Sequence, residues 1–130
     1  METIFTLQTQ KEDIDSLGHV NNCRYVKFLE DARVNWYEKC GLSLNDFQEM
    51  NIGTVVLKME VLYLTEATLG DHLKVITRPE FLGNTSFVFK QDIYNQFDEH
   101  ITDAKVTMVM FDTLLRKSIK VIDQFAQYFK

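Results

Sequence analysis

The stretch that decides the fold reads DIDSLGHVNN, from Asp13 to Asn22, and a long amphipathic run follows it. It places two carboxylates, a glycine, a histidine and two asparagines close together. The run that follows ends at Cys40, so the polar cluster is expected at the first turn of a helix. A helix start offers unpaired backbone N–H groups and the positive end of the helix dipole. Both suit an anionic centre, and the sequence therefore predicts carbonyl chemistry at this point.

The segment from Asn22 to Cys40 is predicted to be a helix with a broad buried face, because its apolar residues recur at steps of three and four. The apolar face consists of Tyr25, Val26, Phe28, Leu29, Ala32, Trp36, Tyr37 and Cys40. The opposite face carries Arg24, Lys27, Asp31, Asn35 and Lys39. Asn21 or Asn22 can cap the start, and Gly41 is suited to end the helix. Ser43 predicts the cap of a second, short helix from Leu44 to Met50.

The remaining segments indicate β-structure. The alternating residues from Thr3 to Lys11 predict a strand, and residues 13–18 have the composition of a loop. Four more strands are predicted, over Thr54–Leu64, His72–Phe81, Thr85–Tyr94 and Ile101–Thr113. The turns that join them are short, which favours an antiparallel sheet. A last amphipathic segment, Asp123–Phe129, predicts a C-terminal helix capped by Asp123.

This order of elements predicts the α+β class, with one long antiparallel sheet wrapped around one central helix. The 130 residues are expected to form a single domain, 1–130. A two-layer domain of this kind leaves the edges of its sheet open, and open edges favour the pairing of two copies.

Composition narrows the class of protein. Hydrophobic residues make up 45% of the chain, which excludes a disordered polypeptide, and the net charge of −5 argues against a general nucleic-acid binder. Cys23 and Cys40 have no zinc-like spacing, so no metal site is expected. Two reduced thiols without a signal peptide predict a cytoplasmic protein. No apolar run approaches the roughly 18 residues of a membrane span.

The motif Asp-x-Asp-x-x-Gly-His-Val-Asn-Asn-x-x-Tyr, from Asp13 to Tyr25, resembles the signature of the hotdog-fold acyl-CoA thioesterases of the 4-hydroxybenzoyl-CoA thioesterase type. Further segments similar to that family are Glu30–Arg33, Lys39–Leu42, Tyr63–Asp71 and Val109–Asp112. The resemblance covers nearly the whole chain. It implies a hotdog fold, a homodimer that often forms a homotetramer, active sites at the dimer interface, and neither a metal nor a cofactor apart from the coenzyme A of the substrate.

The resemblance also implies roles for three residues. Asp15 is the catalytic carboxylate, which attacks the thioester carbonyl directly or activates water. The backbone N–H of Asn22 polarises the carbonyl oxygen. Gly18 lacks a side chain, so the acyl group can approach the backbone there. Taken by itself, Asp15 is equally suited to a turn or a helix cap.

Other candidates keep two interpretations each. His19 is either a general base or a residue that orients its neighbours by hydrogen bonds. Asn21 either binds substrate or caps the helix, and Tyr25 lines either the acyl pocket or the core. Thr85 and Ser86 stand where the family often places small hydroxyl residues near the pantetheine arm. Asp13, by contrast, is expected to be a loop residue.

The substrate class follows from the same resemblance. Asn21 and Asn22 stand where the best-known 4-hydroxybenzoyl-CoA enzymes carry aromatic side chains, so the chain is more similar to the branch of broader acyl thioesterases. We therefore expect hydrolysis of an acyl-CoA or acyl carrier protein thioester to a free acid and a thiol. Arg78, Lys90 and Arg116 are candidates for binding the nucleotide of CoA, although each also suits a solvated surface. The alternatives are a non-catalytic acyl-CoA-binding hotdog protein and a structural oligomer with a degenerate site.

Overall fold

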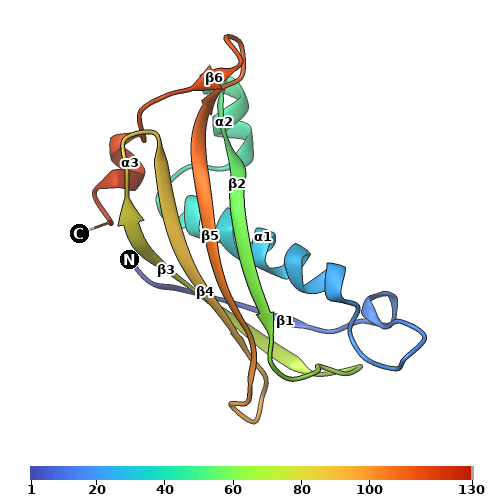
Figure 1. Ribbon diagram of the computed structural model, residues 1–130. Coiled ribbons are helices and arrows are strands. Elements are labelled where there is room, and N and C mark those ends of the chain that lie inside the picture. The colour runs from blue at the N-terminus through green and yellow to red at the C-terminus, as the bar shows by residue number, and fades with distance from the viewer. Residues whose placement is uncertain (130) are drawn as a thin grey trace.

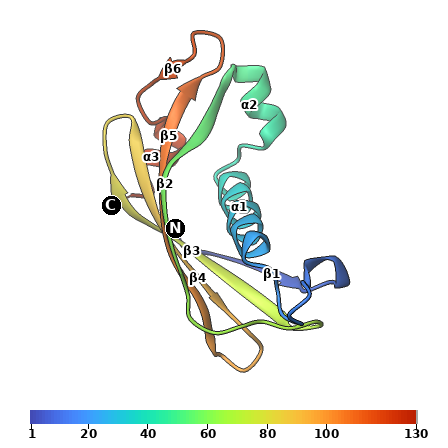
Figure 2. The same cartoon turned by 45° about the vertical axis from the view of Figure 1, so that its right-hand side comes forward.

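The computed structural model describes residues 1–129, in which helix α1, Asn22–Lys39, lies against a curled antiparallel sheet (Figure 1). The strands are β1 (Thr3–Gln8), β2 (Ile52–Tyr63), β3 (His72–Leu82), β4 (Ser86–Tyr94), β5 (His100–Asp112) and the short β6 (Lys117–Ser118). The sheet has the order β1-β3-β4-β5-β2, and β6 pairs with β5. Figure 2 shows the sheet bowed around one side of α1. This architecture confirms the hotdog arrangement that the sequence predicts.

The two predicted helices after the polar cluster are confirmed with their caps. Asn21 is the N-cap of α1, since its Oδ1 accepts the Cys23 N–H at 2.9 Å. After the helix, Gly41 adopts a φ of 91°, a conformation that glycine reaches without strain. Helix α2, Leu44–Met50, begins with a capping box between Ser43 and Asp46.

The two ends of the chain differ from expectation. Strand β1 stops at Gln8 because the chain then forms a 3-10 turn, Lys11–Asp13, in which the Asp13 carboxylate accepts the Gln10 N–H at 2.8 Å. The last helix, α3, spans only Asp123–Ala126. Its N-cap is Ile122, without a side-chain hydrogen bond, so the prediction that Asp123 caps it is wrong.

The core consists of two apolar clusters that follow one another along α1. The cluster under the first half of α1 contains mostly aliphatic residues and includes Val20, Leu29, Ala32, Leu73, Val75, Ile93 and Ile101. The cluster under the second half is rich in aromatic residues and includes Trp36, Tyr37, Phe47, Phe87, Phe89 and Phe125. The helix is therefore held to the sheet along its whole length.

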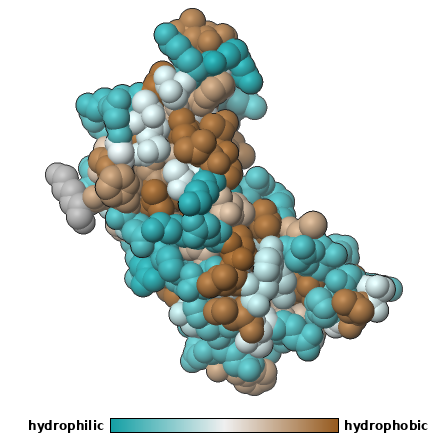
Figure 3. All heavy atoms as spheres, in the orientation of Figure 1, coloured by the Kyte–Doolittle hydropathy of each residue, from teal (hydrophilic) through white to brown (hydrophobic). Residues whose placement is uncertain are grey.

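Strand β2 is one edge of the sheet and is paired only with β5 among the described strands. Its exposed large apolar residues are Val55, Val56, Leu57, Leu62 and Tyr63. In the orientation of Figure 1, apolar surface gathers in patches along the line of this strand (Figure 3). Such an edge offers both unpaired backbone groups and apolar area to a second chain.

Within residues 1–129, no helix is both long enough and apolar enough to cross a membrane.

Candidate active site

Residues 14–20 form a short closed loop in front of α1. Ile14 and Val20 form an antiparallel bridge, and the Asp15 N–H donates to the His19 carbonyl at 3.0 Å. The Gly18 N–H donates to the Asp15 carbonyl at 3.1 Å. These bonds fold residues 14–20 back on themselves immediately before α1.

Asp13 holds this loop to the first turn of α1, a role that the sequence pattern does not indicate. Its side chain is 3% exposed, and its Oδ1 accepts the Arg24 Nε–H at 2.6 Å in an ion pair. Its backbone carbonyl accepts the Asn21 N–H at 2.9 Å. The expectation of a simple loop residue is therefore wrong, since Asp13 joins the 3-10 turn to the first turn of α1. A pair that is eleven residues apart has no local sequence signal.

Asp15 has the turn geometry that its sequence context allows, and its catalytic role stays a prediction. Its Oδ1 accepts the Leu17 N–H at 2.9 Å, which is the geometry of an Asx turn. Among the residues that the structure describes, its Oδ2 has no hydrogen-bond partner. The turn thus fixes the orientation of the half-buried carboxylate and leaves its Oδ2 without a bond.

The start of α1 leaves one backbone donor unused. The Cys23 N–H is bound by the Asn21 side chain, and the Arg24 N–H donates to the Asn21 carbonyl at 2.9 Å. The N–H of Asn22 finds no acceptor anywhere in residues 1–129. This orphan donor lies at the positive end of the helix dipole, where a developing negative charge is stabilised.

A cavity of about 230 Å³ lies at this donor. It is lined by His19, Val20, Asn22, Tyr25, Tyr63, Leu64, Thr65 and Glu66. The His19 Nδ1 lies 3.0 Å from the Val20 carbonyl, which can only accept, so the ring proton is on Nδ1 and Nε2 is an acceptor. Three of the predicted residues, His19, Asn22 and Tyr25, therefore share one cavity.

Tyr25 serves both the core and the cavity. It is 4% exposed, and its hydroxyl accepts the Ala67 N–H at 2.9 Å. Burial raises the pKa of Tyr25, and the carboxylates of Glu66, Asp71 and Asp15 raise it further, while the bond from Ala67 lowers it. Asp15 itself is not among the residues that line this cavity.

Gly18 is required by its backbone conformation. Its φ is 84°, and a Cβ added there would meet nothing within 4 Å. A side chain would therefore be opposed by the left-handed backbone and not by crowding within the chain. The approach of an acyl group to Gly18 stays a prediction.

Thr85 and Ser86 lie elsewhere. Thr85 ends the turn between β3 and β4, where its carbonyl accepts the Met110 N–H at 2.9 Å, and Ser86 is the first residue of β4. Figure 1 shows this turn beside α3, at the opposite end of the sheet from the start of α1. Neither residue lines the cavity of its own chain, and their role in substrate binding stays a prediction.

Two of the three basic candidates are engaged on the face of the sheet that points away from α1. Arg78 and Lys90 pair with the buried Asp92 at 3.1 Å and 2.7 Å, and Lys90 also pairs with Asp103 at 2.8 Å. The ligand atoms of Asp92, His100 and Asp103 lie within 4.8 Å of one another, a spacing that a metal site could use. The ammonium group of Lys90 already supplies positive charge to both carboxylates.

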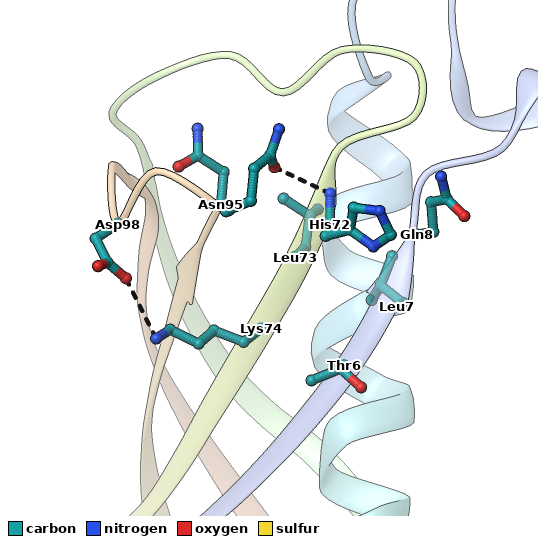
Figure 4. A pocket seen from close by; sticks show the side chains of 9 residues that line it. Thr6, Leu7, Gln8, His72, Leu73, Lys74, Asn95 and Asp98 are labelled. Carbon is teal, nitrogen blue, oxygen red and sulfur yellow. Dashed lines mark hydrogen bonds and ion pairs between the residues drawn. The ribbon is translucent and has the colours of Figure 1, made fainter.

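A larger hollow, of about 550 Å³, lies between β1, β3 and the turn after β4, and it contains none of the predicted catalytic or binding residues. Figure 4 shows Lys74 reaching toward Asp98, and the two form an ion pair of 3.3 Å. The backbone N–H of His72 donates to the Gln96 side chain at 3.0 Å. The polar groups of this hollow thus largely pair with one another.

Known proteins resemble the chain along most of its length. Residues 9–129 match the model of the thioesterase-like superfamily. The acyl-CoA thioester hydrolase YbgC of Escherichia coli O6:H1 is 34% identical over 106 residues, which cover 82% of this chain and 79% of that protein. The long-chain acyl-CoA thioesterase FadM of Escherichia coli K12 is 32% identical over 110 residues, covering 82% and 80%.

A solved structure extends the likeness to the fold. The protein SAV2348 of Staphylococcus aureus, in complex with CoA, has a TM-score of 0.91 and 20% identity, and the match covers 99% of this chain and 84% of that one. The family match spans the loop, α1 and every strand of the sheet except β1. The chain therefore belongs to the thioesterase-like superfamily and is a hotdog-fold thioesterase.

Proposed function

We propose that this thioesterase hydrolyses acyl-CoA and that its reaction takes place at the cavity beside the N-terminus of α1. The single observation that carries this site is the unpaired N–H of Asn22, which lies on the cavity wall next to the loop that bears Asp15. The names of the two Escherichia coli relatives and the CoA bound by SAV2348 support CoA as the carrier.

The chemistry needs an oxygen nucleophile and a donor for the carbonyl oxygen. The free Oδ2 of Asp15 attacks the thioester carbon or takes a proton from the water that attacks it. The Asn22 N–H and the helix dipole stabilise the oxyanion that forms, and a preorganised donor of this kind contributes about 3 kcal/mol to lowering a barrier. When Asp15 attacks, CoA leaves as its thiolate and water then hydrolyses the acyl anhydride on Asp15; when water attacks, CoA leaves directly. In both cases the proton that the water loses goes to the sulfur, and the free acid is released.

His19 and Tyr25 support this geometry. The acceptor Nε2 of His19 can hold the attacking water, because its Nδ1 is committed to the Val20 carbonyl. The Tyr25 hydroxyl fixes the loop that follows β2 through the Ala67 N–H. Asn21, whose side chain caps the helix, acts on the substrate only by holding Asn22 in place. The proposed reaction uses only protein groups and water. CoA is expected to enter only as part of the substrate, and this stays a prediction.

We also propose that the working unit is a dimer formed through β2, from which a homotetramer can be built. The strand is twelve residues long, has an open edge and exposes five large apolar side chains. Two copies paired antiparallel about the middle of β2 would set Ile52 of one chain beside Tyr63 of the other. Tyr63 lines the cavity, and its hydroxyl lies 3.4 Å from the Asn22 carbonyl. Each cavity would then lie at the subunit junction.

This pairing brings the third basic candidate to the site from the other chain. Ile52 pairs with Asp112, and the turn between β5 and β6 begins there. The turn carries Arg116, whose guanidinium lies over the Phe111 ring at 5.0 Å, and the exposed Lys117. In one chain these cations are far from Asp15 along β2, but in the dimer they reach the mouth of the opposite cavity. Their charge suits the phosphates of CoA.

Mixing two inactive variants tests this arrangement. Asp15→Asn removes the carboxylate, and Arg116→Asn removes the cation while tolerating the φ of 57° at this position. Random reassociation of the two variants forms mixed dimers in half of the cases, each with one intact site, so about a quarter of the wild-type kcat/KM should return. No recovery after verified subunit exchange would place Arg116 in the site of its own chain.

A panel of acyl thioesters tests the function itself. Thiol release from acetyl- to palmitoyl-CoA, followed with a thiol reagent, should show turnover, and the same acyl groups on acyl carrier protein should react more slowly. Faster turnover of the carrier protein substrates would reverse the choice of carrier. Binding without turnover across the whole panel would favour the non-catalytic acyl-CoA-binding alternative. The free thiols of Cys23 and Cys40 fit the cytoplasmic location that the sequence predicts.

A further inference from the structure

Arg33 is a charged residue to which the sequence pattern gives no role and which the proposed mechanism does not use. It lies on α1 and is 3% exposed. Its Nη1 donates to the Oε1 of Gln91 at 3.1 Å, and among residues 1–129 no carboxylate lies within ion-pair distance. Gln91 in turn donates to the Leu29 carbonyl and the Thr77 hydroxyl. All these partners are neutral.

A buried cation without a counter-ion is costly, because a neutral amide replaces little of its hydration. Burial lowers the pKa of Arg33 below its ordinary value, although the guanidinium stays charged at neutral pH. A negative group that reached Arg33 would therefore gain both charge attraction and hydrogen bonds in a place with little water.

Arg33 lines a second cavity, of about 270 Å³. The other lining residues are Glu30, Val34, Tyr37, Leu44, Thr54, Val56 and Met108. Most of this wall is apolar, and the carboxylate of Glu30 is exposed and bound by Lys27 at 3.1 Å. The Tyr37 hydroxyl donates to the Thr54 Oγ1 at 3.2 Å, so the hydroxyl hydrogen of Thr54 remains available as a donor.

Two hydrogen bonds, one at each cavity, make the contact between α1 and β2. Tyr63 at the end of β2 meets Asn22 at the start of α1, and Thr54 near the start of β2 meets Tyr37 near the end of α1. The helix rise separates Asn22 from Arg33 by about 16 Å along the axis. An acyl chain that starts at the Asn22 N–H and follows this contact therefore runs toward the guanidinium.

Resting on the proposed thioesterase function, we propose that the substrate is an ω-carboxyacyl thioester whose distal carboxylate binds Arg33. The planar guanidinium can hold a carboxylate through two parallel hydrogen bonds, and Thr54 can add a third. An acyl chain that ends in a methyl group would instead cover the cation with hydrocarbon and leave it unpaired. The start of α1 binds the thioester end of the substrate, and Arg33 binds its carboxylate end.

The test compares substrates of equal length that differ only at the far end. The pairs are suberyl- and octanoyl-CoA, sebacyl- and decanoyl-CoA, and dodecanedioyl- and dodecanoyl-CoA. At the best length, the wild type should prefer the ω-carboxyl substrate by about tenfold or more in kcat/KM, since hydrogen bonds between charged groups are strong. A wild type that hydrolyses the methyl-ended partner equally well at every length would overturn the proposal.

Variants assign the preference to the guanidinium. Arg33→Met keeps the length of the side chain and should reverse the preference, whereas Arg33→Lys should keep part of it. Lys39→Met removes an exposed cation from the same helix and should leave the ratio unchanged. An equal shift in Lys39→Met would mean that long-range charge, not contact with Arg33, sets the preference. Loss of the dimer in Arg33→Met would assign Arg33 to the subunit contact and overturn the proposal.

Equilibrium binding separates this inference from the function on which it rests. If no acyl-CoA is hydrolysed, the proposed function fails, but calorimetry with the wild-type protein still compares free decanoate with the neutral decanamide. Tighter binding of decanoate supports the Arg33 site in that case, and equal or tighter binding of decanamide rejects it. This measurement also remains decisive if Arg33→Met fails to fold.

Discussion

The two ends of α1 differ in packing and in hydrogen bonding. At its C-terminal half, Trp36 is fully buried and lies 4.9 Å from the ring of Phe89 and 5.5 Å from that of Phe125. At its N-terminus, Asn22 is exposed and its N–H is unpaired within the described chain. Tight packing at one end holds the helix, so the other end can leave a backbone donor without a partner. The C-terminal half of α1 thus contributes packing, and its N-terminus offers a free donor for chemistry.

The largest effect is expected from the N-terminal end. Asp15→Asn keeps the hydrogen bond to the Leu17 N–H but removes the charge, and turnover of acyl-CoA should fall by about 10²- to 10⁴-fold. The melting temperature should change little. Thiol release and thermal unfolding, measured on the same preparation, check both statements.

Glu12→Gln is the matched control for this change. Glu12 is an exposed carboxylate in the neighbouring 3-10 turn, and its neutralisation should leave turnover within about twofold. Equal losses in the two variants would show that general charge near the loop matters, and Asp15 would lose its assigned role.

The next effect belongs to the C-terminal end and acts on stability. Trp36→Ala leaves a large cavity among aromatic rings and should reduce the free energy of unfolding by about 3–5 kcal/mol. The Met1 carbonyl also loses the hydrogen bond that it accepts from the Trp36 Nε1–H at 2.9 Å. Urea denaturation measures the loss. Near-normal stability in this variant would mean that the second cluster does not anchor the helix.

A smaller effect is expected where the two functions meet, at Tyr25. Tyr25→Phe keeps the ring but removes the acceptor of the buried Ala67 N–H, and it should cost about 1–3 kcal/mol of stability. Turnover should also fall, because the Ala67 carbonyl accepts the Val20 N–H at 2.9 Å and so ties the loop that bears Asp15 to the segment after β2. Full activity with reduced stability would confine Tyr25 to the core.

The smallest effect concerns the two cysteines, which mark the two ends of α1. Cys23 is exposed, whereas burial raises the pKa of the Cys40 thiol to about 12, against a slight lowering by the N-terminal ammonium group. Iodoacetamide at pH 8 should therefore label Cys23 first, and labelling of both at one rate would contradict the comparison. Because the unfolded thiol ionises near its ordinary value, Cys40 should make the folded state progressively less stable as the pH rises from about 9 toward 12.

The sequence predicts the elements well because their signals are local. Caps at Asn21 and Ser43 and the alternation of polar and apolar residues place the helices and strands within a few residues of their observed bounds. The buried face of α1 was predicted with one omission, Arg33, which a polarity pattern assigns to solvent. The motif also led to the loop and the helix start that form the cavity.

The rest depends on contacts between distant residues. The pairing of Asp13 with Arg24, the bond of Ala67 to Tyr25 and the network of Arg33 with Gln91 join parts of the chain that have no common local pattern. The short strand β6 is fixed only by its pairing with β5. A sequence pattern gives the face on which a residue lies, but it does not give the partner that it meets.

The most direct test of the central claim is a crystal structure of the protein with a thioether analogue of an acyl-CoA that keeps the carbonyl group. The account predicts a carbonyl oxygen within hydrogen-bonding distance of the Asn22 N–H, with the Asp15 carboxylate facing the carbonyl carbon. An analogue bound elsewhere, with the Asn22 N–H still unpaired or Asp15 turned into solvent, would contradict it.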